Sequence, residues 1–328
     1  MKGFVDLQVN GYQGVDFSAP GLNLKQIRYV VKTLRARGTI AFCPTVITSS
    51  TEIYKENLPV LAAAMEERDL APHLLGIHLE GPFISKEEGA RGAHLPQNII
   101  PPDVYLYEQL LDWARGRICL LTLAPELPGA GDLIRKAVER GQVVSLGHHL
   151  ADRDAIRQAC QAGVAAVTHL GNGIPNLLPR HPNPLWDQLD EAALCVMLIA
   201  DGHHVPKTFL RVVARLKGPD KMVVVSDSAP PAGLSAGHYE TLGQEVVLEE
   251  DGRLWNPAGD HLAGSSCCLM ECMNYLASLA LFSEKELWLM GHENPLALIG
   301  KELDSHAFEA FSDVVFEEDK FVIRMDTG

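Results

Sequence analysis

Long apolar runs are missing from the sequence: the longest, such as residues 192–200, fall well short of the roughly 18 residues that a membrane-spanning helix needs. The first residues also lack the apolar core and the cleavage site of a signal peptide. Basic residues are few, since 28 Lys and Arg stand against 42 Asp and Glu, for a formal charge of −14. An acidic chain without a basic stripe is a poor binder of nucleic acid and of anionic membranes. These absences predict a cytoplasmic protein that acts on a small molecule; an anionic substrate then requires a local basic pocket.

Disulfide and nucleotide-binding signatures are absent as well. Seven cysteines are an odd number in a chain without a secretory signal, which favours a reducing compartment over a disulfide scaffold. No GxGxxG or P-loop motif follows any apolar run, which argues against a doubly wound nucleotide-binding sheet. Hydrophobic residues, in contrast, make up 47% of the 328 positions, which excludes intrinsic disorder and provides a large core.

Short apolar runs alternate with helical patterns along most of the chain. Near-continuous β-branched runs are typical of strands that are covered on both faces. Eight such βα units predict a (β/α)8 barrel, with an open doubly wound sheet as the alternative. The expected strands are 4–9, 40–46, 74–79, 118–123, 143–146, 165–168, 193–199 and 222–225, and the expected helices are 24–37, 52–68, 104–115, 132–139, 152–161 and 207–216.

The pattern changes after the eighth strand. Residues 239–255 alternate apolar and polar around an Asp-Gly turn, which predicts a β-hairpin. Ser265 and Ser266 are expected to cap a following helix, and residues 314–325 alternate weakly, as in a terminal strand pair. The expected organisation is a barrel over residues 1–300, including the hairpin at about 239–256, and a short C-terminal tail over residues 301–328.

Metal-competent side chains follow the expected strands. The active site of a (β/α)8 barrel lies at the carboxyl ends of its strands, and five of the eight strands here end in His, Glu or Asp. Such groups are costly to bury unless they are used, so the rim predicts a mononuclear metal site. Glu80, His148 and His169 provide a three-ligand set for Zn²⁺ or Fe²⁺ with a position open for water. Asp227, after the last strand, is then free to act as a general base.

Several motifs together resemble one known family. The segments FVDLQVNG, HLEGPF with a following GAH, SLGHH, THLGNGIPNL, ADGHHV, VSDSAPPAG and LAGSS occur in the order found in N-acetylglucosamine-6-phosphate deacetylases of the amidohydrolase superfamily. The resemblance covers roughly residues 4–300. It implies a (β/α)8 amidohydrolase barrel, one or two divalent metals and removal of acetate from an amino-sugar phosphate.

The resemblance also implies roles for individual residues. The three expected ligands match the family's metal ligands, and Asp227 matches the acid/base that takes a proton from water and returns it to the leaving amine. His94 matches a substrate-contacting residue that stabilises the developing oxyanion. Arg180 matches a phosphate-binding residue that reaches into a neighbouring subunit, which implies a homodimer. The other expected substrate contacts are Ala93, Asn172, Gly173, Asp201, His204, Leu262, Ala263 and Gly264.

Four features depart from the family pattern. Gln8 and Asn10 stand where many amidohydrolases have His-x-His, and amides are poor ligands for a second zinc, which implies one tightly held metal. The family forms a small β-sandwich from residues before the first strand and from the tail, and here that unit is expected to be reduced or absent. His149 stands where the family more often has a small residue. The loop around Arg180 is unusually rich in proline.

The remaining candidates have ordinary interpretations. His78 is expected to pack or to support the site, His149 to support it or to form the pocket wall, and His203 to stand outside it beside His204. Cys267, Cys268 and Cys272 fall on an apolar helical pattern and are expected to be buried small hydrophobes rather than a metal cluster.

Two other functions stay open. A metal amidohydrolase of this type can act on another N-acyl amino sugar or on a cyclic amide, and a barrel without turnover can bind a sugar phosphate. The complete set of three ligands and Asp227 argues against the second alternative.

Overall fold

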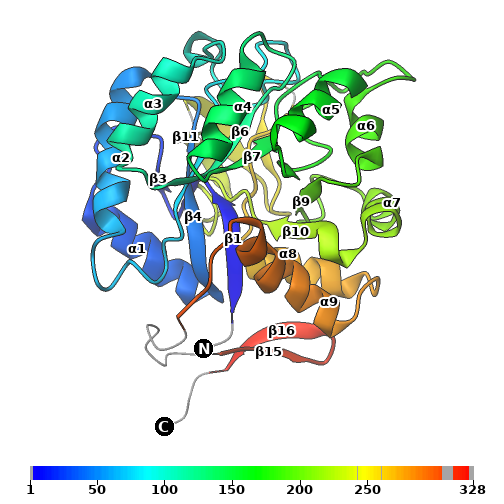
Figure 1. Cartoon of the computed structure of the whole chain (residues 1–328). Coiled ribbons are helices and arrows are strands. Elements are labelled where there is room, and N and C mark those ends of the chain that lie inside the picture. Colours follow the sequence, from blue (N-terminus) through cyan, green and yellow to red (C-terminus); the bar gives the residue numbers. More distant parts are fainter. Residues whose placement is uncertain (1–2, 242, 260, 305–312, 325–328) are drawn as a thin grey trace.

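The computed structural model describes residues 3–241, 243–259, 261–304 and 313–324. Eight parallel strands form one sheet in which each strand neighbours the next along the chain. Its two end strands meet where the backbone N–H groups of Asn10 and Gly11 donate to Ser228 O, so the sheet closes into the expected barrel (Figure 1). The barrel strands are β1 (Phe4–Val9), β4 (Thr39–Ile47), β5 (Ile77–Glu80), β6 (Ile118–Leu123), β7 (Val143–Leu146), β8 (Ala166–Val167), β9 (Cys195–Ile199) and β10 (Met222–Val225).

Helices cover the outside of the barrel. Each turns an apolar stripe inward; α1, for example, buries Ile27, Val30, Val31 and Leu34. Gly163, with a φ of 112°, ends α5 in the left-handed conformation that glycine tolerates best. The helices are α1 (Leu24–Arg35), α2 (Thr51–Ala64), α3 (Val104–Trp113), α4 (Ala130–Glu139), α5 (Arg153–Ala162), α6 (Pro184–Asp190) and α7 (Lys207–Lys217), with 3₁₀ turns at Pro96–Asn98 and Pro219–Lys221.

The inside of the barrel is apolar near the amino ends of the strands. Val5, Leu120 and Val223 belong to one buried cluster there, and Leu296 and Ile299 close it from below. Polar side chains begin at the carboxyl ends. The fold therefore separates a packed core from a polar rim, as barrels of this kind do.

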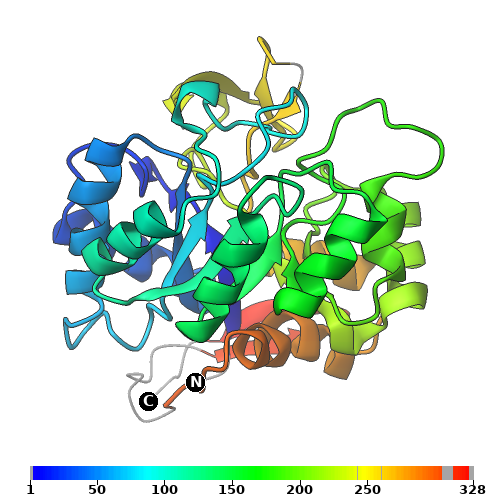
Figure 2. The same ribbon diagram turned by 45° about the horizontal axis from the view of Figure 1, so that its top comes forward.

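An inserted antiparallel sheet covers the rim. The expected hairpin is part of a larger unit of four strands, β11 (Gly237–Thr241), β12 (Gln244–Leu248), β13 (Leu254–Asn256) and β14 (His261–Leu262). Figure 2 shows this sheet, in yellow, beside the cyan segment after β5 and opposite the end that carries the termini. A ribbon of β2 (Gly11–Tyr12) and β3 (Val15–Asp16) follows β1.

The carboxyl-terminal part packs on the other end. The expectation that Ser265 and Ser266 cap the next helix is wrong, because Cys268 is the N-cap and the Ser265 N–H bonds to Asp227 O instead. Phe321 packs edge-on against Phe4, with ring centroids 4.9 Å apart. The elements are α8 (Leu269–Ser278), α9 (Glu284–Trp288), a π-turn (Leu289–Glu293), α10 (Asn294–Leu298), β15 (Asp313–Glu317) and β16 (Lys320–Arg324); the expected strand residue 325 lies outside the described residues.

None of the helices in the described ranges is long and apolar enough to span a bilayer.

Candidate metal centre and pocket

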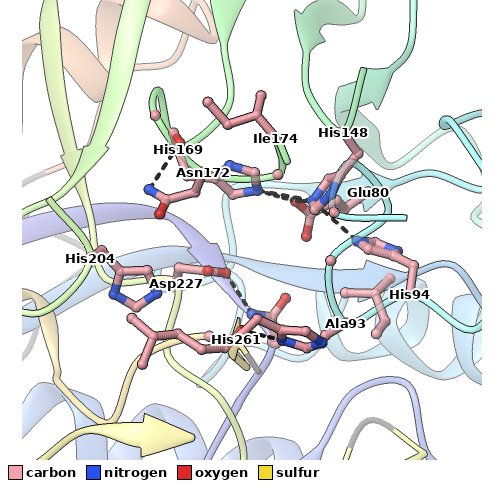
Figure 3. Close-up of a pocket in the computed structure, with 18 of the residues that line it drawn as sticks. Glu80, Ala93, His94, His148, His169, Asn172, Ile174, His204, Asp227 and His261 are labelled. Atoms are coloured by element: carbon pink, nitrogen blue, oxygen red, sulfur yellow. Dashed lines mark hydrogen bonds and ion pairs between the residues drawn. The ribbon is translucent and has the colours of Figure 1, made fainter. Parts of the chain in front are cut away.

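Three strand-end side chains meet at the carboxyl end of the barrel (Figure 3). Glu80 Oε1 lies 3.2 Å from His148 Nε2 and 2.9 Å from His169 Nε2, and the two nitrogens are 3.0 Å apart. All three side chains are buried. Within the described ranges, they are the one group of three or more His, Cys, Asp or Glu residues whose ligand atoms lie this close together.

The backbone at these strand ends is strained. His148, His169 and Asp227 have φ values of 52°, 33° and 51°, a region that residues other than glycine rarely occupy. Each such residue costs about 1–3 kcal/mol and persists where the surrounding structure over-determines it, most often at functional sites. The strain is therefore an independent sign that these three positions carry the chemistry.

The hydrogen bonds place acceptor lone pairs of the ligand side chains at the centre of this cluster. His148 Nδ1 donates to Ala90 O at 2.8 Å, so its Nε2 is unprotonated and faces Glu80. Burial alone would raise the pKa of Glu80, but the neighbouring His148 and His169 side chains hold it well below its usual range. His169 Nδ1 is buried and has no hydrogen-bond partner in the part of the chain that is described. Lone pairs that converge in a buried site favour a cation, and two imidazoles with one carboxylate suit a divalent metal.

Gln8 and Asn10 act as donors to the two carboxylates. Gln8 Nε2 donates to Glu80 Oε1 at 3.0 Å, and Asn10 Nδ2 donates to Asp227 Oδ1 at 2.7 Å. Their own side-chain oxygens are buried and without a partner among the described residues. The two amides therefore orient the carboxylates on which the site depends.

Asp227 is placed for proton transfer. Its side chain is buried at the pocket floor, and burial together with the Glu80 carboxylate raises the pKa of Asp227 to about 6. A carboxyl group with a pKa near neutrality can both take a proton and return it.

His94 presents an N–H group to the site. Because His148 Nε2 carries a lone pair, His94 Nε2, 3.2 Å away, is the protonated nitrogen of its ring. His94 Nδ1 then accepts from the Thr48 hydroxyl at 2.8 Å. Burial lowers the pKa of His94 well below its usual range, so the ring is neutral.

The pocket above these residues has a volume of about 450 Å³, which suits a small ligand. Seven expected substrate contacts line it, and three do not. Asp201 accepts from His204 Nδ1 at 2.7 Å and so holds His204 instead. Ala263 is buried in an apolar cluster, and Arg180 is exposed on the loop after β8. The residues that line the pocket as expected are Ala93, His94, Asn172, Gly173, His204, Leu262 and Gly264.

Sequence reasoning missed part of the lining. Trp255 and His261 come from the inserted sheet, and Ile174 and Asn176 come from the loop after β8. His261 adjoins the LAGSS motif, a signal that was available, whereas Trp255 reaches the pocket only through strand pairing. The structure also shows why Gly173 is a glycine: a Cβ there would lie 2.9 Å from His148 Nδ1, at a φ of 63°.

The other histidines and the cysteines lie outside the ligand set. His149 is buried, accepts from the Ala151 N–H and contacts Gln188, and burial lowers its pKa to about 3. His203 Nε2 donates to Asp251 O at 3.1 Å. Cys267, Cys268 and Cys272 pack in or against the main apolar core.

Comparisons with known proteins find deacetylases of amino-sugar phosphates, although no family model matches the chain. N-acetylglucosamine-6-phosphate deacetylase of Mus musculus is 33% identical over 334 residues, 96% of this chain and 78% of its own length. N-acetylgalactosamine-6-phosphate deacetylase of Shewanella sp. is 31% identical over 280 residues, 85% of this chain and 68% of its own length. Among solved structures, an Asp-to-Ala variant of N-acetyl-D-glucosamine-6-phosphate deacetylase from Mycobacterium smegmatis, in complex with N-acetyl-D-glucosamine-6-phosphate, is 26% identical. It has a TM-score of 0.87 and matches over 99% of this chain and 84% of that one.

Proposed function

The chain belongs to the family of N-acetylglucosamine-6-phosphate deacetylases, and on this premise we propose that it hydrolyses the acetamide of N-acetylglucosamine 6-phosphate to glucosamine 6-phosphate and acetate. One observation carries the proposal: Glu80, His148 and His169 converge within hydrogen-bond distance at the rim of an amidohydrolase barrel, with Asp227 beside them.

The same three residues would hold one divalent ion, and we propose zinc. Two imidazoles and one carboxylate with an open position are typical of catalytic zinc sites, and Fe²⁺ shares this preference. Bound there, the ion supplies Lewis acidity toward the acetamide carbonyl and water. Gln8 and Asn10 support a single ion, because both present N–H donors to the carboxylates and amides are poor ligands for a second zinc.

The protein's own groups then move the proton. Asn10 occupies one oxygen of Asp227, which leaves the other to take a proton from the attacking water and to return it to the departing amine. His94 directs its Nε2–H toward the site and can donate to the oxyanion, while Thr48 holds the ring in that tautomer.

The phosphate requires a cation that this pocket does not itself supply. Its lining in the described structure contains neither Lys nor Arg. Arg180 stands exposed on the loop after β8, and in the same segment Leu177 (91%) and Trp186 (48%) are exposed as well. Large apolar side chains that gather on one exposed segment are typical of protein contacts. We therefore propose a homodimer in which Arg180 of a second copy binds the phosphate.

Replacing Arg180 with Ala is expected to raise KM for the phosphorylated substrate about 10- to 100-fold, with little change in kcat, because a charge-assisted contact to the phosphate is lost. Steady-state kinetics measures KM and so tests the phosphate contact. Sedimentation velocity tests whether the protein is a homodimer. Arg157→Ala, on exposed α5 surface, is the matched control. A parental KM in the Arg180 variant, or a monomeric parent, would contradict it.

Acetate release tests the function directly. The zinc-loaded protein is expected to release acetate from N-acetylglucosamine 6-phosphate, to lose this activity on chelation and to regain it when zinc is restored. N-acetylgalactosamine 6-phosphate belongs in the same assay, because a relative is named for that substrate. Faster turnover of the galactosamine epimer would favour that second candidate, and no release from either sugar would overturn the proposal.

We propose that the protein resides in a reducing cytoplasm. All seven cysteines are free thiols, which supports this assignment.

A further inference from the structure

Four buried polar side chains form a continuous chain beside the metal centre. His78 Nε2 lies 2.8 Å from Thr122 Oγ1, Thr122 Oγ1 lies 2.7 Å from Thr168 Oγ1, and Thr168 Oγ1 lies 2.7 Å from Ser145 Oγ. All four are 1% exposed or less. They come from β5, β6, β7 and the end of β8; of these, β5, β7 and β8 lead to Glu80, His148 and His169. None of the four is among the described residues that line the pocket.

The backbone carbonyl beside His78 favours one direction of donation along this chain. His78 Nδ1 is 3.1 Å from Leu7 O, and because a carbonyl oxygen only accepts, this nitrogen carries the hydrogen. His78 Nε2 is therefore a lone pair that receives the Thr122 hydroxyl hydrogen. Thr122 in turn accepts from Thr168, and Thr168 accepts from Ser145. Each hydroxyl hydrogen is used once, so removal of the Thr122 or Thr168 hydroxyl leaves a buried donor without its acceptor, and removal of the Ser145 hydroxyl takes one donor from Thr168.

The same threonines shape the backbone at the ligands. A Cβ on Gly147 would lie 2.6 Å from Thr122 Cγ2 and 3.0 Å from Thr168 Cβ, so the residue before His148 is clamped between them. Thr168 itself precedes His169. Both ligand histidines follow these positions directly, and both have the positive φ angles that a surrounding structure must enforce.

We propose that the His78–Thr122–Thr168–Ser145 chain is a positioning layer, which locks four strands in one register so that the three ligand atoms meet before the ion arrives. It makes no contact with substrate. The inference rests on the proposed metal-dependent function and adds the residues that pre-organise its site.

Conservative variants separate this role from general stability. Thr122→Val and Thr168→Val keep the side-chain shape but remove the hydroxyl, and they are expected to weaken zinc binding about 10- to 100-fold. Thr122→Ser and Thr168→Ser restore the hydroxyl and are expected to stay within a few-fold of the parent. Thr39→Val is the matched control, because Thr39 is equally buried on β4 and its hydroxyl has no partner among the described residues. Zinc affinity is measured by competition with a chromophoric chelator, and folding is followed by thermal unfolding of the metal-free protein.

The outcomes are distinct. Parental zinc affinity in folded Thr122→Val and Thr168→Val would overturn the inference, as would equal weakening in Thr39→Val. If the valine variants do not fold, Ser145→Ala removes only the terminal donor of the chain, and parental affinity in that variant overturns it too. A parent protein that binds no zinc or releases no acetate counts against the proposed function, not against the positioning layer.

Discussion

Asp227→Asn is expected to lower kcat by about 10²- to 10⁴-fold while the protein keeps its metal, because positioned acid–base groups contribute factors of this size. An amide cannot take the proton from water, and it cannot return one to the leaving amine. The three expected ligands are untouched by the change. The measurement is kcat and zinc content on the same preparation.

The Asp227→Asn substitution removes the proton-transfer group and is expected to preserve the local backbone and hydrogen bonding. Asp227 has a φ of 51°, a conformation that Asn tolerates better than most residues. The amide oxygen can still accept from Asn10 Nδ2, so the local hydrogen bond survives. Asp220→Asn, at an exposed carboxylate, is the control for the loss of one charge. Activity within tenfold of the parent would refute the assignment of Asp227 as acid and base.

Glu80→Gln is expected to weaken zinc binding by about two orders of magnitude or more and to abolish turnover at ordinary zinc concentrations. Glu80 supplies the one negative charge in the ligand set, and its pKa is held low by the imidazoles around it. A neutral amide loses that charge while it keeps the volume of the side chain. The effect exceeds that expected for supporting residues because a ligand itself is changed.

Thermal unfolding provides a second readout of the Glu80 variant. A ligand that binds only the folded state stabilises it by about 2.7 kcal/mol at a hundredfold excess over its Kd. Zinc is therefore expected to raise the Tm of the parent and of the exposed control Glu139→Gln, and to leave the Tm of Glu80→Gln nearly unchanged. Equal stabilisation of all three proteins by zinc would show that the ion binds elsewhere.

Local sequence signals were sufficient for the barrel. The expected bounds of the strands 4–9, 118–123, 143–146 and 222–225 coincide with β1, β6, β7 and β10. These strands are buried on both faces, so an unbroken apolar run is required there and turn residues mark its ends.

Elements that depend on distant contacts were not predicted as well. Helix α6 went unrecognised, because its seven residues show too little periodicity. The inserted unit has four strands and not the two of the expected hairpin. Strands β13 and β14 were missed because they are too short to show alternation and are defined by their pairing with neighbouring strands. Ser265 resembles a helix cap, but a ladder bond to Asp227 O keeps it extended.

The sequence by itself determined the architecture and the kind of chemistry, because periodicity, residue type and order along the chain are local properties. Only the tertiary structure decided how the side chains are used. It made Gln8 and Asn10 donors, set His94 as an N–H group and brought Trp255 and His261 to the pocket. It also left Arg180 outside its own pocket. These outcomes depend on which atoms of distant strands meet and at what backbone angles, and that is settled only when the barrel closes.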